Sequence, residues 1–337
     1  MAKLPLPSNT RLVTIVAQVD HGKTTLADSL IESNGIISER MAGSIRFLDA
    51  LAEEQRRGIT MRASAIGLKH LYKKPKRKQT TDQKSEEEMV IHLIDSPGHI
   101  DFSMEVTSSL LLCDGALLVV DAVEGMCART HMILREAYSQ NLVPVLILNK
   151  LDRLCLELCL TPTEAYTRLR NLLENVNAAA AAMIISNRHQ KEEQDENEKA
   201  EEQNQQDQNI EEEIWSFDPA KGNVIFASAF YGWGFSVPSL ARSLFQNKAI
   251  SFKPQLLKQY LFADCKYNPE TKKMNKWKQE SVERDDNIPV FAEFALKPLW
   301  EIYEGVDAAA GVVGLSRCVQ ILIYFHYQLF YGCHFSP

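Results

Sequence analysis

Residues 10–32 read TRLVTIVAQVDHGKTTLADSLIE, and this segment carries the strongest signal of the fold. The apolar run at 12–17 is typical of a short buried strand, and residues 24–32 carry apolar side chains at helical spacing. The connection at 17–24, AQVDHGKT, fits the phosphate-binding pattern GxxxxGK[ST], with Ala17 in place of the first glycine. A strand, a tight polar loop and a helix in this order predict a site for a nucleotide phosphate.

The residue types in this loop explain the chemistry. Backbone N–H groups at a helix N-terminus wrap phosphate oxygens, Lys23 reaches the β and γ oxygens, and the Thr24 hydroxyl binds Mg²⁺. Gly-Lys-Thr alone recurs by chance in about one chain in ten, so the flanking strand and helix carry much of the argument. The loop residues predicted to contact the nucleotide are Asp20, His21, Gly22, Lys23, Thr24 and Thr25.

Short apolar runs alternate with helical patterns along the rest of the chain. The further predicted strands are 90–94, 116–120, 143–148 and 224–227, and the further predicted helices are 101–113, 129–140 and 163–175. This alternation predicts an α/β fold of the P-loop NTPase kind, a mostly parallel sheet with helices on both faces. In such sheets ligands bind at the carboxyl ends of the strands.

A second motif, DSPGH at 95–99, closes the strand at 90–94. Asp95 stands at the strand end, where a carboxylate can hold Mg²⁺ through water, and the Gly98 N–H can meet a γ-phosphate. The alternative is an ordinary turn containing Pro-Gly.

A third motif, NKLD at 149–152, closes the strand at 143–148, and Ser228 and Ala229 follow the strand at 224–227. The Asp152 carboxylate can accept the N1–H and the amine of guanine, which adenine does not present. A site built to bond those donors rejects the wrong base by about 10⁴ or more. The Ala229 N–H can donate to the guanine keto oxygen, and Asn149 and Lys150 complete the predicted guanine site.

These three motifs would coincide by chance at about 10⁻⁵ or less. Residues 56–60, RRGIT, add Thr60 ahead of a candidate strand at 61–68. We expect its hydroxyl or carbonyl to close over Mg²⁺ when a γ-phosphate is present, as nucleotide-sensing segments do.

The amino-acid composition excludes several classes of protein. The 337 residues are 45% hydrophobic and 24% charged, which is typical of a soluble globular protein and not of a disordered, collagen-like or disulfide-rich one. The net charge of -7 is concentrated in residues 191–213, which hold 11 acidic and 2 basic residues. Together with the alanine run at 178–182, this stretch predicts a disordered insertion at about 178–213.

Two features bear on location and partners. The N-terminus has no secretory h-region, and the seven cysteines lack zinc-site or disulfide spacing, so we expect a cytoplasmic protein. The basic run at 73–78, KKPKRK, is either a solvated hairpin tip or a nucleic-acid or nuclear-import signal.

The motifs AQVDHGKTT, RRGIT, DSPGHIDF and NKLDR together resemble the GTPase domain of translational GTPases of the elongation factor two class. The likeness continues through LRNLLENVN and GNVIFASAFYGWGF and covers about residues 10–305. The Ala-Gln loop, the Glu/Gln-rich insertion and FADCKYNPETKK at 262–273 resemble the members that act in cytoplasmic maturation of the 60S ribosomal subunit.

The resemblance implies roles for individual residues. GTP or GDP with Mg²⁺ would be bound, Thr24, Thr60 and Asp95 serving the metal, and Lys23 and Thr60 would support hydrolysis. His99 would orient the attacking water when the large ribosomal subunit's RNA positions it, and Asp20 would help hold a monovalent cation. The alternatives are a polar turn residue at His99 and a loop-capping carboxylate at Asp20.

At the level of the whole chain, the resemblance implies a monomeric, ribosome-stimulated GTPase that works with maturation factors to release the anti-association initiation factor six. The alternatives are a translocating elongation factor and a truncated nucleotide-binding module without productive turnover. We expect a GTP-binding domain at 1–305, with the family's later domains absent and a divergent apolar tail at 306–337. The run at 319–335 includes Gln320, His326, Gln328 and His334, too polar for a confident membrane span.

Overall fold

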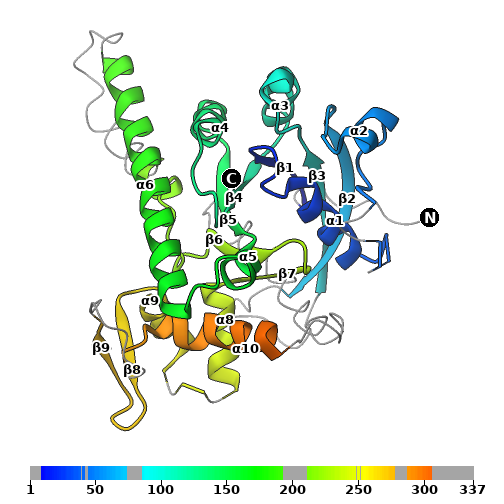
Figure 1. Ribbon diagram of the computed structural model, residues 1–337. Helices are drawn as coiled ribbons and strands as arrows, with labels where there is room; N and C mark the ends of the chain where they lie inside the picture. Colours follow the sequence, from blue (N-terminus) through cyan, green and yellow to red (C-terminus); the bar gives the residue numbers. More distant parts are fainter. Residues whose placement is uncertain are drawn as a thin grey trace.

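The structure, a computed structural model, describes residues 9–38, 40–41, 45–73, 86–192, 211–247, 249–250, 252–277 and 287–305. Within these residues the centre is a seven-stranded sheet in the order β2-β3-β1-β4-β5-β6-β7 (Figure 1). Its strands are β1 (Thr10–Ala17), β2 (Ser64–Lys73), β3 (Glu86–Asp95), β4 (Gly115–Asp121), β5 (Val143–Asn149), β6 (Val224–Ser228) and β7 (Trp233–Ser236).

The five central strands run parallel, and only the two edge strands, β2 and β7, run antiparallel to their neighbours. The mostly parallel sheet predicted from the sequence is therefore confirmed. The register sets the strand ends side by side: Ile15 pairs with Asp95, and Asp121 pairs with Asn149. The motifs that follow β1, β3 and β5 consequently leave the sheet at one edge.

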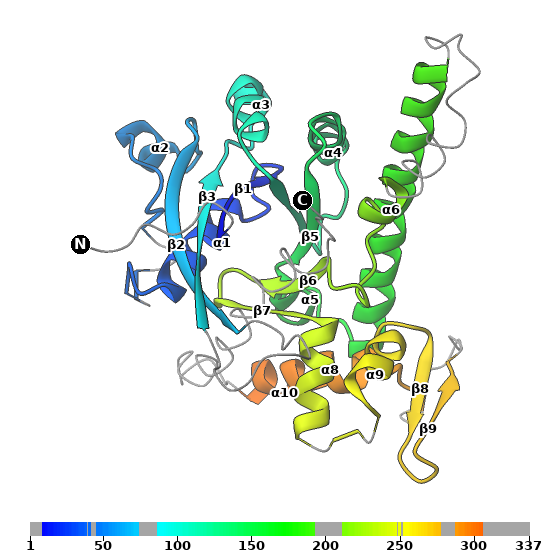
Figure 2. The ribbon, with the colours of Figure 1, turned by 180° about the vertical axis from the view of Figure 1, so that it is seen from behind.

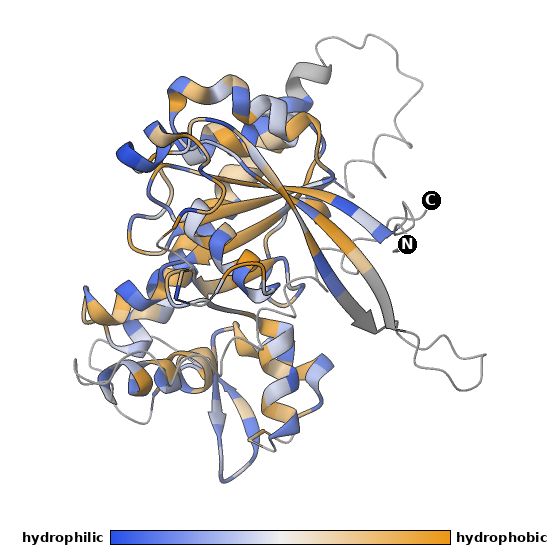
Figure 3. Ribbon diagram, turned by 90° about the vertical axis from the view of Figure 1, so that its right-hand side faces the viewer, coloured by the Kyte–Doolittle hydropathy of each residue, from blue (hydrophilic) through white to orange (hydrophobic). Residues whose placement is uncertain are grey.

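Helices cover both faces of the sheet, as predicted. The helices are α1 (Lys23–Ser33), α2 (Ala52–Arg57), η2 (Ile100–Phe102), α3 (Ser103–Leu111), α4 (Ala128–Ser139), α5 (Leu151–Leu156), α6 (Pro162–Glu192), α8 (Val237–Gln246), α9 (Pro254–Leu261), η3 (Ala292–Leu296) and α10 (Lys297–Gly305). Alternate strand residues face opposite ways: Ile15 and Val119 pack with α1, whereas Val16 and Leu118 pack with α3, α4 and α6. The strands at the centre of the sheet are correspondingly mostly apolar (Figure 3).

The helix α6 is longer than predicted, and it overlaps the predicted insertion at 178–213. Residues 178–192 continue the helix, because alanine is the best helix former and Ala180, Met183 and Ile184 are buried against the core. The predicted start of the insertion is therefore wrong. Residues 193–210 lie outside the described part of the chain.

The C-terminal elements pack against the end of the sheet at β6 and β7 (Figure 2). They comprise α8, α9, the hairpin β8 (Cys265–Asn268) and β9 (Lys273–Lys276), and the π-helical η3 that continues into α10. Phe291 joins them to the sheet, since its ring lies 4.8 Å from the rings of Phe226 and Phe262. These aromatic contacts place 252–277 and 287–305 on the same core as the sheet.

Three predictions fall outside the described residues: the basic run beyond residue 73, the acidic part of the insertion at 193–210, and the tail at 306–337. A search of the described helices finds none with the length and apolar character needed to cross a membrane.

Candidate nucleotide-binding site

The phosphate loop connects β1 to α1 and adopts a tight conformation. Asp20 and Gly22 have positive φ angles of 63° and 94°. A Cβ on Gly22 would lie 2.4 Å from the Asn149 Nδ2 atom, so this position requires glycine. The same Nδ2 donates to the His21 carbonyl at 2.9 Å, which ties the loop to the end of β5. The first and third sequence motifs are therefore in direct contact.

Lys23 begins α1 and is buried, with its Nζ donating to the Gln18 carbonyl at 3.3 Å. Burial lowers the pKa of Lys23, opposed by the negative charges of Asp95 and Asp20. A Cβ on Gly98 would lie 2.3 Å from the Lys23 Nζ, so there is no room for a side chain where the DSPGH turn passes the lysine. The second motif thus meets the first.

The two threonines predicted to serve a metal lie together. The Thr24 Oγ1 is 3.0 Å from the Thr60 Oγ1, although the residues are 36 positions apart in the chain. Asp95 is fully buried beside them, and neither of its oxygens has a hydrogen-bond partner among the described residues. Burial raises the pKa of Asp95 to about 7, opposed by the positive charge of Lys23 and by the Thr24 hydroxyl, which lies near the carboxyl without a well-formed hydrogen bond to it.

This donor set fits a magnesium ion. Mg²⁺ takes oxygen ligands, and two hydroxyls beside an unsatisfied buried carboxylate supply them. An ion here would also stabilise the charged form of Asp95, which burial alone disfavours.

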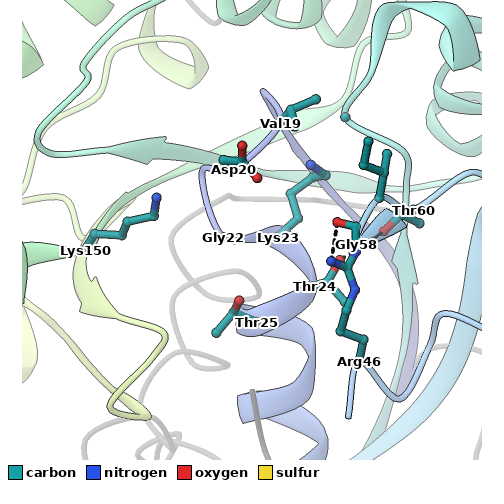
Figure 4. A pocket seen from close by; sticks show the side chains of 12 residues that line it. Val19, Asp20, Gly22, Lys23, Thr24, Thr25, Arg46, Gly58, Thr60 and Lys150 are labelled. Atoms are coloured by element: carbon teal, nitrogen blue, oxygen red, sulfur yellow. Dashed lines mark hydrogen bonds between the residues drawn. The ribbon is translucent and has the colours of Figure 1, made fainter. Parts of the chain in front are cut away.

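A cavity of about 330 Å³ opens over these groups (Figure 4). It is lined by Val19, Asp20, Gly22, Lys23, Thr24, Thr25, Arg46, Gly58, Ile59, Thr60, Gly98 and Lys150. Arg46 donates to the Gly58 carbonyl and lies 3.5 Å from the Thr60 Oγ1, so it holds the segment carrying Thr60 against the cavity.

Glu54 fixes the other side of that segment. Its carboxylate accepts the N–H groups of Met61 at 2.9 Å and Arg62 at 3.0 Å, and its second oxygen accepts the Leu51 N–H at 2.9 Å. Burial would raise the pKa of Glu54, but these backbone donors outweigh it and the pKa is lowered. Because Met61 and Arg62 bond Glu54, β2 begins at Ser64 and not at the predicted residue 61.

The predicted guanine-reading residues lie at the ends of β5 and β6. Asp152 is buried, its Oδ1 has no partner among the described residues, and Ser228 hydrogen-bonds the carboxyl. Burial raises the pKa of Asp152, opposed by that bond. The Ala229 N–H donates to the Asn149 Oδ1 at 2.9 Å, so it is satisfied within the chain.

Lys150 joins the two ends of the site. It has a positive φ of 61°, its side chain lines the cavity, and its Nζ lies 2.8 Å from the buried Asp121 Oδ2. Burial would raise the pKa of Asp121, but the hydrogen bonds from Lys150 and the Val123 N–H dominate and lower it. Asp152 does not line the described cavity, so only the phosphate end and Lys150 form it.

His99 stands apart from this cavity. Its side chain is 41% exposed, and its Nδ1 accepts the Asp101 N–H at 3.2 Å. The structure therefore places the predicted water-orienting residue at the surface, at the start of η2 and one position after Gly98, and outside the lining of the cavity.

Sequence reasoning missed Arg46, Glu54 and Asp121. Asp121 carries a usable signal, because it ends β4 as Asp95 ends β3. Arg46 and Glu54 carry none, since each acts through backbone groups that only the folded chain brings near.

A phosphate loop on a parallel sheet, with a lysine, two threonine hydroxyls and an unsatisfied carboxylate, defines a P-loop nucleotide-binding domain. The family described as "Elongation factor Tu GTP binding domain" matches residues 8–294, and the chain belongs to this family. This confirms the predicted class, a translational-type GTPase domain.

Individual relatives have names consistent with this family. The chain is 44% identical over 300 residues to "Ribosome assembly protein 1" of Saccharomyces cerevisiae, covering 89% of this chain and 26% of that protein. It is 40% identical over 311 residues to "Elongation factor-like GTPase 1" of Homo sapiens, covering 89% and 26%. It is 40% identical over 314 residues to "Ribosome assembly protein 1" of Schizosaccharomyces pombe, covering 93% and 29%. The chain thus spans about a quarter of the length of these relatives.

Proposed function

We propose that the chain binds and hydrolyses GTP with Mg²⁺ as part of a ribosome-associated GTPase that acts in cytoplasmic maturation of the large ribosomal subunit. Membership of the elongation factor Tu family and the names of the relatives support this proposal. The observation that carries it is the buried cluster of Lys23, Thr24, Thr60 and Asp95 beneath an open cavity.

Phosphoryl transfer needs positioning and charge neutralisation, and no covalent step on the protein. Lys23 would place its ammonium on the β and γ oxygens, and the loop N–H groups around Gly22 would bond the same phosphates. Thr24 and Thr60 would hold Mg²⁺ with Asp95 behind it, and the ion supplies positive charge to the developing phosphate oxygens.

The base would bind at the ends of β5 and β6. Asp152 has a buried oxygen without a partner, which a guanine N–H would satisfy and adenine would leave unsatisfied. The Ala229 N–H, now bonded to Asn149, would turn to the guanine keto oxygen. Guanine binding at this site therefore requires a local exchange of one hydrogen bond.

Hydrolysis would require a partner. His99 is exposed and outside the cavity, so it can orient a water molecule only after its loop moves toward the γ-phosphate. Large-subunit RNA is the proposed partner that brings this about. The chain itself acts as a monomer that would bind a monovalent cation at Asp20 and work with maturation factors, releasing the anti-association initiation factor six.

A nucleotide titration tests the base and phosphate assignment. Fluorescent GDP, GTP and ATP analogues are titrated into the chain with Mg²⁺, and we expect guanine nucleotides to bind about 10⁴-fold more tightly than ATP. Equal affinity for ATP would refute the guanine site. Multiple-turnover GTP hydrolysis with and without purified large subunits then tests the partner, and subunit-independent rates would contradict it.

A further inference from the structure

Beneath the phosphate loop, three side chains of different chemistry converge. The His21 nitrogen, a Glu124 oxygen and the Cys127 sulfur all lie within 4.8 Å of one another. His21 comes from the loop between β1 and α1, whereas Glu124 and Cys127 come from the turn between β4 and α4, with Cys127 immediately preceding α4. The cluster therefore joins two segments that are about a hundred positions apart in the chain.

His21 is the buried member, and its ring is only half satisfied. The side chain has no solvent exposure, and its Nδ1 accepts the Asp121 N–H at 3.3 Å. Its Nε2 lies 3.3 Å from the Glu124 Oε2, yet the geometry gives this nitrogen no hydrogen bond. A buried ring nitrogen left without a hydrogen bond costs free energy, and a ligand at this point would recover it.

The surroundings of Nδ1 suit metal ligation through Nε2. A histidine that binds a metal through one nitrogen donates its other N–H to a backbone carbonyl or a carboxylate. Because Nδ1 accepts the Asp121 N–H, the ring proton lies on Nε2. A metal ion at Nε2 would move this proton to Nδ1, where the Val119 backbone offers the ring a hydrogen bond in place of the one from Asp121.

The other two ligands give an ion a path to the ring. The Glu124 side chain is 42% exposed, and Cys127 is partly buried, with its Sγ 3.8 Å from the Gly125 carbonyl. An ion can therefore enter from solvent on the Glu124 side without disturbing the core.

We propose that His21, Glu124 and Cys127 form a binding site for a transition-metal ion of the Zn²⁺ class. Imidazole, carboxylate and thiolate are the ligands of Zn²⁺, whereas Mg²⁺ takes oxygen, and three protein ligands leave a fourth position for water. Binding releases the thiol proton to solvent and forms a sulfur–metal bond. None of the three residues lines the nucleotide cavity, so the metal and a nucleotide occupy separate places.

The consequence is a cross-link between the phosphate loop and the β4–α4 turn. His21 is flanked by the two positive-φ residues of the loop, Asp20 and Gly22. An ion held at the ring would restrain this conformation directly.

The test uses the full chain with Co²⁺ as a spectroscopic probe and Zn²⁺ competition against a chromophoric chelator. The wild type should bind one Co²⁺ with a thiolate-to-cobalt charge-transfer band. Cys127→Ser should abolish the band and weaken Zn²⁺ about tenfold or more, and Glu124→Gln should weaken Zn²⁺ with the band retained. Cys159→Ser, an exposed cysteine outside the cluster, is the matched control and should change neither quantity.

Absence of the thiolate band in the wild type would overturn the proposal, as would unchanged Zn²⁺ affinity in Cys127→Ser or loss of the band in Cys159→Ser. Circular dichroism and GDP binding of each variant show that it is folded. Because GDP binding is read separately, failure of the metal site leaves the proposed GTPase function untouched.

Discussion

Substituting Gly22 with alanine tests the contact between the phosphate loop and β5. The position has a φ of 94°, and an added Cβ would lie 2.4 Å from the Asn149 Nδ2. That amide now donates to the His21 carbonyl at 2.9 Å and belongs to a buried side chain. The variant must therefore adopt a left-handed backbone with a side chain and also displace a buried hydrogen bond.

The two costs can be estimated separately. A left-handed conformation costs a residue with a side chain roughly 1–2 kcal/mol, and leaving a buried donor unsatisfied costs about 1–3 kcal/mol. We expect Gly22→Ala to lower the free energy of unfolding by about 2–5 kcal/mol. GDP affinity should also fall, because Asn149 holds the loop that wraps the phosphates.

Gly35→Ala supplies the control. Gly35 has a φ of 70°, but a Cβ there meets no atom within 4 Å, so only the backbone cost of about 1–2 kcal/mol applies. Both variants are unfolded in urea without nucleotide and titrated with GDP. The difference between them separates the cost of the displaced Asn149 hydrogen bond from the backbone cost. Equal destabilisation of the two variants, or unchanged GDP affinity in Gly22→Ala, would show that the contact between Gly22 and Asn149 does not hold the loop.

Three further predictions concern the site. Asp152→Ala should reduce the preference for GTP over ATP from about 10⁴-fold toward unity, measured by competition with a fluorescent nucleotide; a retained preference would remove Asp152 from base recognition. Burial raises the pKa of Asp95 in the folded chain to about 7 against an ordinary 3.8, so its contribution to stability is present at low pH and is lost as the pH rises from about 4 to about 7. Mg²⁺-dependent nucleotide affinity should rise over the upper part of that window as the proton is released, and Asp95→Asn should flatten the profile; an equally steep profile in Asp95→Asn would assign the titration elsewhere. His99→Ala should leave GTP binding within about twofold while abolishing hydrolysis stimulated by large subunits, and undiminished stimulated turnover would contradict its proposed role.

The parallel sheet and the position of the motifs were predictable, because each motif follows an apolar run that becomes a strand. The carboxyl ends of parallel strands share one edge, so Lys23, Asp95 and Asn149 could be placed near one another from strand order alone. The structure shows their contacts through the Gly98 approach to Lys23 and the Asn149 bond to the phosphate loop.

The start of β2, the length of α6 and the position of the His99 side chain depend on contacts that the sequence pattern does not reveal. The start of β2 is set by Glu54, which takes the N–H groups of Met61 and Arg62 out of the strand ladder. The continuation of α6 past residue 178 is supported by burial of Met183 and Ile184, residues that follow an alanine run. The exposed His99 side chain accepts the Asp101 N–H, a contact that no spacing predicts.

We propose that one site takes a guanine at β5 and β6 and its phosphates at the β1–α1 loop. A crystal structure of the chain with Mg²⁺ and a non-hydrolysable GTP analogue would show both ends of this site at once. We predict the Lys23 ammonium on the β and γ phosphate oxygens, the Thr24 hydroxyl on the ion, and the Asp152 carboxylate on the guanine N–H groups. A nucleotide bound with its base away from Asp152, or with its phosphates outside the cavity of about 330 Å³, would contradict the proposed site.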